Sequence, residues 1–533
     1  MSSCIHTVHS QFNNKFKRKR TSIMKLAAGS LMAGLAGAEG ILNDSALKTG
    51  YANSGNIVCY YTNWSQYRPG TGKFMPEDID ATLCTHMVFS FAKMCNSANG
   101  WTLCPYEWND MDESWTDGLY TRMRNLKNQN SSLKMLLAVG GWNHGSTGFV
   151  EMVSSTANID SFISNSMAFV NSIGYDGLDL DWEYPAKTTV DSSPPADYQN
   201  FQTLCERYRT RINSNQPGFM LTAAVGIGQD KIFTIDGAVP SYNVSHLSDN
   251  LDMIHLMAYD IHGHWEDKTG HHANAYTKES DDRLGYTDSI DWIIYNWIEE
   301  GADPKKLVLG LGAYGRSFKL AGSDTGFMAP TSLGSNDLYS GSAGPYTREP
   351  GYLAYYEICE KLRNGWTSVW DDEAQVPYAY GDGDWVGYDN QRSIGVKVNM
   401  AKSYGLAGIM WWAVDIDDFD GSFCNQGKYP LMTYAKNVLL SDDPVPTNPS
   451  TTPHSTQSTQ STQSSTTQTT TQSSSSNGTC DNTGYAPHPS DCSKWIQCTP
   501  TGNIEGQCAN GLYWDQSNTA CNWDYLVDCS NDS

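Results

Sequence analysis

Short runs of apolar and β-branched residues alternate with longer amphipathic stretches over residues 56–440. The eight runs that predict strands are Asn56–Thr62, His86–Ala92, Lys134–Val139, Gly177–Trp182, Met220–Gly226, Met253–Tyr259, Leu307–Gly312 and Leu406–Trp412. Most segments between them can hold a helix, so the pattern favours an α/β fold, a (β/α)8 TIM barrel, with a doubly wound sheet as the alternative. Residues 316–385, between the seventh and eighth runs, are too long for one crossover and predict an inserted α+β subdomain.

The composition changes after the barrel domain, which we place at residues 55–440. No residue in 444–479 is charged, and 25 of the 27 residues in 450–476 are Ser, Thr or Gln. Such a composition cannot bury a hydrophobic core, so residues 441–479 are predicted to form a disordered linker. A separate small module follows at residues 480–533.

The N-terminal residues 1–38 have the layout of an export signal. The basic stretch at residues 15–20 precedes a short apolar stretch that ends in Ala36, Gly37 and Ala38, which is typical of a secretory signal with a small-residue cleavage site. A membrane anchor is the alternative, but the 13 apolar or small residues that end at Ala38 are fewer than the ~20 that a spanning helix needs. We therefore expect a secreted, extracellular protein.

The charge is strongly acidic, with 35 Lys plus Arg against 58 Asp plus Glu and a formal net charge of −23. Residues 1–38 hold six of the basic residues and no acid, so the chain without them carries a net charge of −29. This balance argues against nucleic acid and anionic membrane as partners, because both need clustered cations. The 17 Trp and 30 Tyr suggest flat apolar surfaces on which sugars could stack. We expect a monomer.

Three acidic residues alternate with apolar residues in YDGLDLDWEYP, residues 175–185. In a strand, this spacing places Asp179, Asp181 and Glu183 on one face, which in a barrel points inward near the active-site end. A solvated acidic strand face is the alternative. Crowded carboxylates cannot all ionise freely, so one should hold a proton near neutral pH and serve as a general acid, as in glycoside hydrolysis. Asp181 and Glu183 approach a sugar from the same side, so the nucleophile must come from another strand or from the substrate.

The same segment resembles the DxxDxDxE motif of the family 18 glycoside hydrolases, the chitinases. Further segments resemble this family in order: VCYYTNWSQYRPG (58–70), EWND (107–110), GGWN (140–143), LMAYDIHGHWE (256–266), LGAYGRSF (311–318) and GIMWWAVDIDDF (408–419). One departure is visible, because this chain has Ala138 where the family's third strand usually has Ser. The resemblance implies a substrate-assisted, retaining hydrolysis of β-1,4-linked N-acetylglucosamine polymers.

The resemblance also implies roles for individual residues. Glu183 would protonate the glycosidic oxygen, and the acetamido oxygen of the sugar would attack the anomeric carbon. Asp181 would orient the acetamido group, Asp179 would share a proton with Asp181, and Tyr259 would hydrogen-bond the acetamido group. The implied substrate-binding residues are Trp412, Met257, Asp260, Trp142, Asn143, Tyr184, Trp265 and Arg316.

Two other functions are compatible with these motifs. Some relatives lack the catalytic Glu and only bind chitin, so a non-catalytic, lectin-like chitin-binding protein is the alternative to a chitinase. An enzyme that trims N-glycan cores shares the barrel but has little use for a chitin-binding tail. The expected partners are chitin and N-acetyl chito-oligosaccharides. We expect no cofactor and no metal, because the twelve His show no convincing metal-ligand spacing.

Six of the fourteen cysteines crowd into the last module, which suggests disulfides and an oxidising compartment. Zinc binding is the alternative, but no CxxC pair occurs, and spacing alone leaves fifteen connectivities open. The pattern resembles the peritrophin-A type (family 14) chitin-binding module, which implies Cys480–Cys498, Cys492–Cys529 and Cys508–Cys521. We expect Trp514 and Trp523 to face ligand there.

The other cysteines are scattered through the chain ahead of the linker. The family resemblance suggests Cys59–Cys84 and Cys359–Cys424 as disulfides in the barrel domain. Cys95 and Cys104 could close a small loop, and Cys205 is expected to be a buried free thiol.

Overall fold

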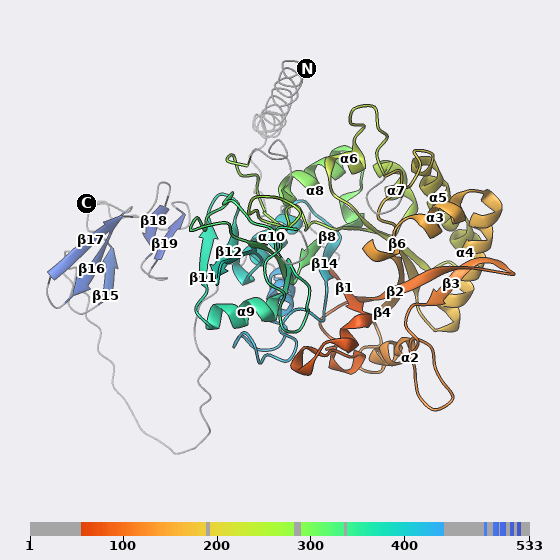
Figure 1. The fold of residues 1–533 in the computed structure, drawn as a ribbon, viewed down its shortest axis with the longest axis horizontal. Helices are drawn as coiled ribbons and strands as arrows, with labels where there is room; N and C mark the ends of the chain where they lie inside the picture. Colours follow the sequence, from red (N-terminus) through yellow and green to blue (C-terminus); the bar gives the residue numbers. More distant parts are fainter. Residues whose placement is uncertain are drawn as a thin grey trace, which may run out of the picture. The chain divides into compact units, whose positions relative to one another are not determined.

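The computed structural model describes residues 55–187, 192–281, 289–334 and 338–441, and the backbone of five short strands between Gly484 and Trp523. Eight parallel strands close into a barrel (Figure 1). They are β1 (Asn56–Thr62), β2 (His86–Ser97), β4 (Lys134–Gly140), β5 (Gly177–Asp181), β6 (Met220–Val225), β7 (Met253–Leu256), β8 (Leu307–Gly312) and β14 (Gly408–Trp412). Strand β1 pairs with both β2 and β14, which confirms the barrel and excludes the open, doubly wound sheet.

All eight predicted strands occur, but several end earlier than the sequence pattern predicts. Strand β5 ends before Trp182, and β7 ends at Leu256 rather than Tyr259. The residues that follow are therefore loop residues at the carboxyl ends of the strands, where barrel active sites form. Strand β2 instead runs on past Ala92 and pairs with the antiparallel strand β3 (Gly100–Pro105). This hairpin reaches out beyond the barrel in Figure 1.

Helices surround the strands and cover their outer faces (Figure 1). They are α2 (Leu119–Arg124), α3 (Thr147–Val153), α4 (Thr156–Ser172), α5 (Asp197–Asn215), α6 (Gln229–Ile232), α7 (Val244–Asn250), α8 (Ile290–Glu299), α10 (Gln391–Ser403) and α11 (Pro430–Leu440). Side-chain caps fix several of their starts: Ser155 accepts from the Asn158 N–H at α4, and Ser289 accepts from the Trp292 N–H at α8. The hydrophobic core lies between these helices and the strands, most of whose residues are buried.

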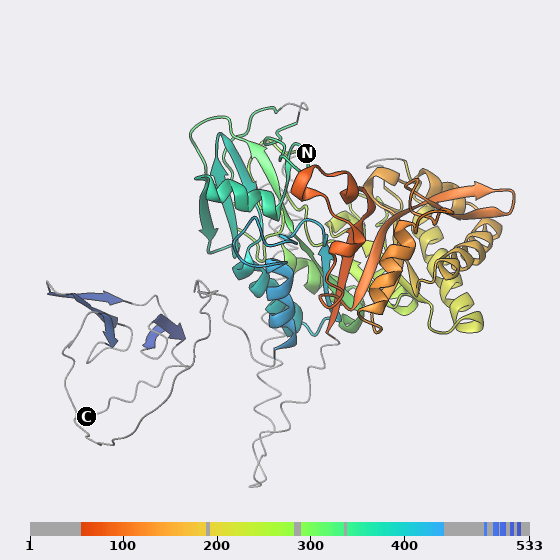
Figure 2. The same cartoon turned by 90° about the horizontal axis from the view of Figure 1, so that it is seen from below.

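The inserted α+β subdomain is present between β8 and β14, as predicted. It consists of β9 (Tyr314–Lys319), β10 (Tyr352–Ala354), α9 (Tyr355–Arg363), β11 (Thr367–Asp371), β12 (Val376–Gly381) and β13 (Asp384–Gly387). The strands form an antiparallel sheet in the order β10-β9-β13-β12-β11. In Figure 2 this sheet, largely teal, stands beside the barrel.

Three disulfides are formed among the described residues: Cys59–Cys84, Cys95–Cys104 and Cys359–Cys424. The second joins β2 to β3 within their hairpin. Cys205 is a buried free thiol on α5. Burial raises the pKa of this thiol to about 12, so it stays protonated and unreactive near neutral pH.

The C-terminal module is all-β in its described strands. Strands β15 (Gly484–Pro487), β16 (Lys494–Thr499) and β17 (Gly502–Gln507) form an antiparallel sheet, and β18 (Leu512–Asp515) pairs with β19 (Ala520–Trp523). Trp514 lies on β18 and Trp523 on β19, but the side chains that would form the predicted tail disulfides lie outside the described residues. So do the export signal and the linker. Of the helices that the structure describes, none has the length and apolar character to span a bilayer.

Candidate active site

Strand β5 lies between β4 and β6 and carries the acidic residues into the barrel. Asp179 is fully buried, Asp181 is 3% exposed, and Glu183, two residues beyond the strand end, is 8% exposed. The opposite face packs under the helices, where the Trp182 ring stacks on Phe149 of α3 with a centroid distance of 4.9 Å. The alternation of acidic and apolar residues therefore separates a polar interior from an apolar exterior, and the acids are not a solvated strand face.

Asp179 is held by donors from three other strands. The Tyr60 hydroxyl on β1 donates to Oδ2 at 2.7 Å, and the Thr222 hydroxyl on β6 donates to Oδ1 at 2.5 Å. Nδ1 of His255 on β7 lies 3.3 Å from Oδ1. Ala138 of β4 lies opposite Asp179 in the strand register and offers no polar group. Thr222 lies opposite Asp179 on the other side of β5 and supplies the hydroxyl from that side.

Asp181 has a different environment from Asp179. Its Oδ1 is buried and has no hydrogen-bond partner among the described residues. Burial, together with the nearby Glu183 and Asp179 carboxylates, raises the pKa of Asp181 well above its ordinary value. Because a buried acceptor without a partner is costly, this oxygen is available to a donor that enters with a ligand.

Glu183 is suited to hold a proton near neutral pH. Burial raises its pKa to about 7, and the charge of Asp260 acts in the same direction. Hydrogen bonds from the Tyr184 hydroxyl and the Trp142 backbone N–H oppose this increase. A carboxyl group with such a pKa can donate a proton and later take one back, as general acid–base catalysis requires.

Two glycines let β4 approach the acidic strand closely. The Gly141 N–H donates to the Asp181 carbonyl oxygen at 2.8 Å. Gly140 has a φ of +119°, and a Cβ there would lie 1.9 Å from the same oxygen. Only glycine fits at Gly140, so the GG pair keeps the segment that bears Trp142 against Glu183.

The loop that follows β7 forms the floor of the site. Tyr259 is 7% exposed, and its hydroxyl lies 3.9 Å from Met410 Sδ. Asp260 receives a bidentate pair from Arg316, at 2.7 and 2.6 Å, and a hydrogen bond from the Tyr314 hydroxyl at 2.7 Å. Burial would raise the pKa of Asp260, but the charge and hydrogen bonds of Arg316 outweigh it and hold the pKa well below its ordinary value.

Aromatic rings line the entrance to the site. Trp412, at the end of β14, is partly buried and packs near Tyr60, Phe91 and Trp64 with centroid distances of 5.6, 6.0 and 6.2 Å. Trp142 is 54% exposed. Half-exposed rings of this kind are typical platforms for sugar rings.

The other predicted substrate-binding residues lie on the same loops. Trp265 is 46% exposed and lies over the Arg316 guanidinium at 5.6 Å. Met257 and Tyr184 are partly buried, and the Tyr184 ring lies 4.6 Å from Lys231 Nζ. Asn143 is exposed beside Trp142. Trp514 and Trp523 belong to the separate C-terminal module.

Sequence reasoning missed several residues of this site. Trp64 lies within one of the recognised motifs but was not singled out, although a Trp soon after a barrel strand is a usable signal. His255 is fully buried, and it contacts Asp179 and the Tyr60 hydroxyl rather than only apolar groups. His255 is two residues from Met257, and residues two apart lie on the same face of a strand. This spacing from a predicted substrate-binding residue was a usable signal that His255 belongs to the site.

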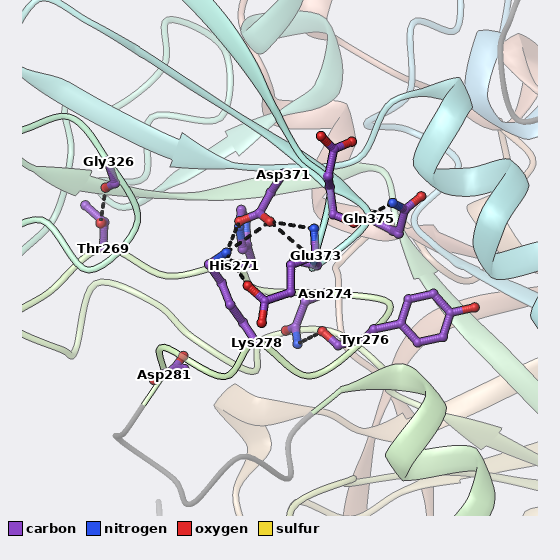
Figure 3. A network of polar contacts seen from close by, with 12 residues as sticks. Thr269, His271, Asn274, Tyr276, Lys278, Asp281, Gly326, Asp371, Glu373 and Gln375 are labelled. Carbon is purple, nitrogen blue, oxygen red and sulfur yellow. Dashed lines mark hydrogen bonds and ion pairs between the residues drawn. The ribbon is translucent and has the colours of Figure 1, made fainter. Parts of the chain in front are cut away.

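A polar network anchors the loop after β7 to the inserted subdomain (Figure 3). Asp371, at the end of β11, accepts from Lys278 at 3.2 Å and pairs with His271 Nε2 at 3.0 Å. Lys278 also contacts Glu373 at 2.9 Å. His271 lies in a loop and is buried there, and burial lowers its pKa. Within the described residues, no group of three or more His, Cys, Asp or Glu side chains could hold a metal ion.

A row of buried carboxylates at the carboxyl end of a (β/α)8 barrel, under a rim of exposed tryptophans, is an arrangement typical of the glycoside hydrolase class of proteins. The family comparison specifies which kind. Residues 56–417 match the glycosyl hydrolases family 18, and residues 480–529 match the chitin binding Peritrophin-A domain. The chain belongs to glycosyl hydrolase family 18.

Relatives of the chain include both chitinases and a pseudo-chitinase. Chitotriosidase-1 of Mus musculus is 36% identical over 485 residues, which cover 89% of this chain and 96% of the relative. The Group II chitinase catalytic domain 2 of Ostrinia furnacalis superposes with a TM-score of 0.65 at 37% identity, covering 72% of this chain and 96% of that one. Human YKL-39, described as a pseudo-chitinase with retained chitooligosaccharide binding, gives 0.64 at 35% identity, with 74% and 100% covered. Family membership alone therefore does not establish catalysis.

Proposed function

We propose that this protein is a secreted chitinase that hydrolyses the β-1,4 linkages between N-acetylglucosamine units of chitin. The observation that carries the proposal is Glu183, a buried carboxyl group with a pKa of about 7 that lies beside Asp181 at the end of β5. A family member that only binds sugar has no need to keep a proton donor at this position.

In the first step, Glu183 donates its proton to the glycosidic oxygen while the carbonyl oxygen of the 2-acetamido group attacks the anomeric carbon. The bond from that carbon to the glycosidic oxygen breaks, and an oxazolinium ion forms. In the second step, the Glu183 carboxylate takes a proton from water as the water oxygen attacks the anomeric carbon. The acetamido group is restored, and the two inversions give net retention.

Asp181 is proposed to accept the acetamido N–H and to offset the positive charge of the oxazolinium ion. Its unpartnered Oδ1 supports this role, because a substrate N–H would supply the missing hydrogen bond. Asp179 is proposed to share a proton with Asp181 from a position fixed by Tyr60 and Thr222. Tyr259, buried on the adjacent loop, would hydrogen-bond the acetamido group.

The substrate chain is proposed to lie along the aromatic rim. Trp412 would stack beneath the reacting sugar, and Trp142 and Trp265 would bind sugars further along the chain. Met257 and Asn143 would line the same path, with the Arg316–Asp260 pair as a rigid polar wall. The C-terminal module, with Trp514 and Trp523 as its proposed ligand-facing rings, would raise the local concentration of chitin around a monomeric enzyme. Secretion is supported by the disulfides of the barrel domain, which favour an oxidising compartment.

The test is the release of reducing ends from N-acetylated chito-oligomers by the full-length protein and by Glu183→Gln. We expect the variant to lose about a thousandfold in rate, the middle of the range for loss of a general acid. The protein is a chitin-binding lectin instead if the wild type is as inactive as the variant and both still bind chitin. Fully deacetylated oligomers should resist cleavage, and ready cleavage of them would refute the acetamido nucleophile.

A further inference from the structure

Most of the exposed aromatic side chains of the described residues lie in two short segments of the chain. Eight aromatic residues rank among the exposed large hydrophobics, and five of them lie in the two short segments 64–67 and 106–115. Trp115 at 73% exposure and Trp108 at 70% are the most exposed of all. Rings as large as these are usually buried, so a concentration of them in water indicates a binding surface.

Polar contacts join the two segments into one surface. Asn109 Nδ2 donates to Gln66 Oε1 at 2.8 Å, and the Tyr67 hydroxyl donates to Glu107 Oε2 at 2.7 Å. The buried Asp110 accepts from Asn63 at 3.3 Å. Residues 106–110 are thus held against the loop after β1 and do not move independently of it.

Trp115 lies in a tight turn that one isolated antiparallel β-bridge, between Glu113 and Thr116, closes. Glu113 and Thr116 exchange backbone hydrogen bonds at 2.9 and 3.3 Å, which leaves Ser114 and Trp115 as the turn. Asp112 closes the base by accepting from the Gly118 N–H at 2.8 Å. The ring is therefore held outward by the backbone that supports it.

This surface is continuous with the proposed substrate path. Trp64 lies on the loop after β1 and packs 6.2 Å from Trp412 and 6.1 Å from Phe91, nearly parallel to the latter ring. From Trp64, the contacts run through Gln66 and Asn109 to the turn that bears Trp115. An extended ligand that leaves the groove past Trp64 meets this surface.

The charged residues near Trp115 limit the kinds of ligand that can bind there. The acids nearest to it along the chain are Asp112, Glu113 and Asp117, and residues 106–118 contain no Lys or Arg. One cation lies close to this surface, because Lys93 Nζ of β2 is 5.9 Å from the Tyr106 ring. The acids of residues 106–118 outnumber it, so the surface disfavours nucleic acid and anionic membranes. An uncharged polysaccharide has flat sugar faces that stack on indole rings and no charge to be repelled.

We propose that residues 106–118, with Trp115 at the tip, form a second chitin-binding surface on the catalytic domain, distinct from the C-terminal module. It holds insoluble chitin outside the groove and guides a chain toward Trp64 and Trp412. The proposal rests on the proposed function for its choice of polysaccharide, but chitin binding at Trp115 does not require that the protein cleave chitin.

The first experiment is hydroxyl-radical footprinting of full-length Glu183→Gln with and without insoluble chitin, read by mass spectrometry. We expect chitin to lower the oxidation rate of Trp115 at least threefold and to leave Tyr276 unchanged. Tyr276 is a matched control because it is 41% exposed and lies outside the two segments. Equal oxidation of Trp115 with and without chitin, under conditions where the protein is fully adsorbed, overturns the proposal. So does protection of Trp115 without chitin that grows with protein concentration, which indicates a second copy as the occupant.

The second experiment compares Trp115→Ala and Trp115→Tyr with the wild type. We expect Trp115→Ala to hydrolyse insoluble chitin two- to fivefold more slowly while its rate on the soluble N-acetylated tetramer stays unchanged, and Trp115→Tyr to retain most of the activity. An unchanged ratio of the two rates overturns the proposal. If the wild type cleaves neither substrate, the proposed function fails, and the footprinting still decides whether Trp115 binds chitin.

Discussion

Two buried sites in this protein shift the pKa of their carboxyl groups in opposite directions. In the barrel, the pKa of Asp181 and the pKa of Glu183 are raised by burial. In the network between the loop after β7 and the inserted subdomain, burial also acts on Asp371, but His271, Lys278 and backbone N–H groups outweigh it and lower the pKa of Asp371. Burial alone therefore does not decide the protonation state.

The hydrogen-bond donors account for the difference. Asp371 accepts from the Ala374 and Glu373 N–H groups at 3.1 Å in addition to the two side chains. Asp181 keeps a buried oxygen without a partner among the described residues. The arrangement at Asp371 is typical of a carboxylate that stabilises the fold. The arrangement at Asp181 is typical of a carboxylate that lowers the stability of the fold but is available to bind a ligand.

The largest effect on the rate that we expect within this comparison comes from replacing Asp181, the acid with the unpartnered oxygen. Asp181→Asn should lower kcat on the N-acetylated tetramer by roughly 10²–10³-fold, because in the proposed mechanism the Asp181 carboxylate offsets the charge of the oxazolinium ion and the amide cannot. Steady-state kinetics measures this. Asp176→Asn is the control, since Asp176 lies just before β5 and contacts Lys127 and the Met135 N–H instead of the site. Equal losses of kcat in Asp181→Asn and Asp176→Asn would contradict a specific role of the Asp181 carboxylate in the site.

The pH dependence of the rate follows from the raised pKa of Glu183. The proton donor must be protonated in the free enzyme, so kcat/KM should fall about tenfold per pH unit once the pH exceeds about 7. Because Asp181 and Glu183 interact, the apparent pKa measured from this fall in kcat/KM belongs to the pair of carboxyl groups and not to Glu183 alone. A rate profile from pH 4 to 10 gives the limb, and an undiminished rate at pH 9 would rule out a carboxyl donor with this pKa.

The same raised pKa predicts a change in stability. The ordinary pKa of a Glu is 4.5, so burying Glu183 costs nothing at lower pH, and the cost grows to its full value as the pH rises past about 7. Glu183→Gln should therefore raise the free energy of unfolding by roughly 3 kcal/mol at pH 8, and the gain should vanish at pH 4. Denaturant unfolding at the two pH values measures this. Glu206→Gln, at a side chain 67% exposed, should change neither value.

The smallest effect is expected at Asp371, whose hydrogen bonds are all made. There the substitution should lower the free energy of unfolding instead of raising it. Asp371→Asn should lower the free energy of unfolding by about 1–3 kcal/mol at pH 7, because it leaves His271 and Lys278 without their partner. Since the pKa of Asp371 is depressed, its contribution is present above its ordinary value of 3.8 and is lost as the pH falls below it. Asp372→Asn is the neighbouring control, at a side chain 89% exposed. If Asp371→Asn has the wild-type free energy of unfolding at pH 7, Asp371 does not stabilise the fold and does not differ from Asp181 in the way described.

The sequence predicted those parts of the structure that depend on local periodicity. The two-residue spacing of Asp179, Asp181 and Glu183 was enough to place them on one inward face. The alternation of apolar runs favoured the barrel, and the pairing of β1 with both β2 and β14 excluded the doubly wound sheet. It could not show where β7 ends, because Met257 and Tyr259 continue the apolar pattern after the strand hydrogen bonds have stopped.

Contacts between distant segments were beyond the sequence pattern. Asp260 and Arg316 are 56 positions apart, and their pairing depends on how the inserted subdomain meets the barrel. Thr222 and His255 each occupy one polar position in an apolar strand, and only the closed barrel brings them to Asp179. The same holds for the Asp371 network, whose members lie on a loop and on a hairpin of the insert.

The pairing of β1 with β14 has a consequence for how the molecule is made. Asn56 is in register with Gly408, and a Cβ at Gly408 would lie 2.0 Å from the Asn56 carbonyl oxygen, so the last barrel strand fits against the first with no room to spare. During synthesis, β1 must wait for about 350 residues before its second neighbour exists, because the strands emerge in chain order. A chain that stops before Gly408 has neither a closed barrel nor Trp412, so the proposed activity should appear only after the last strand has been made.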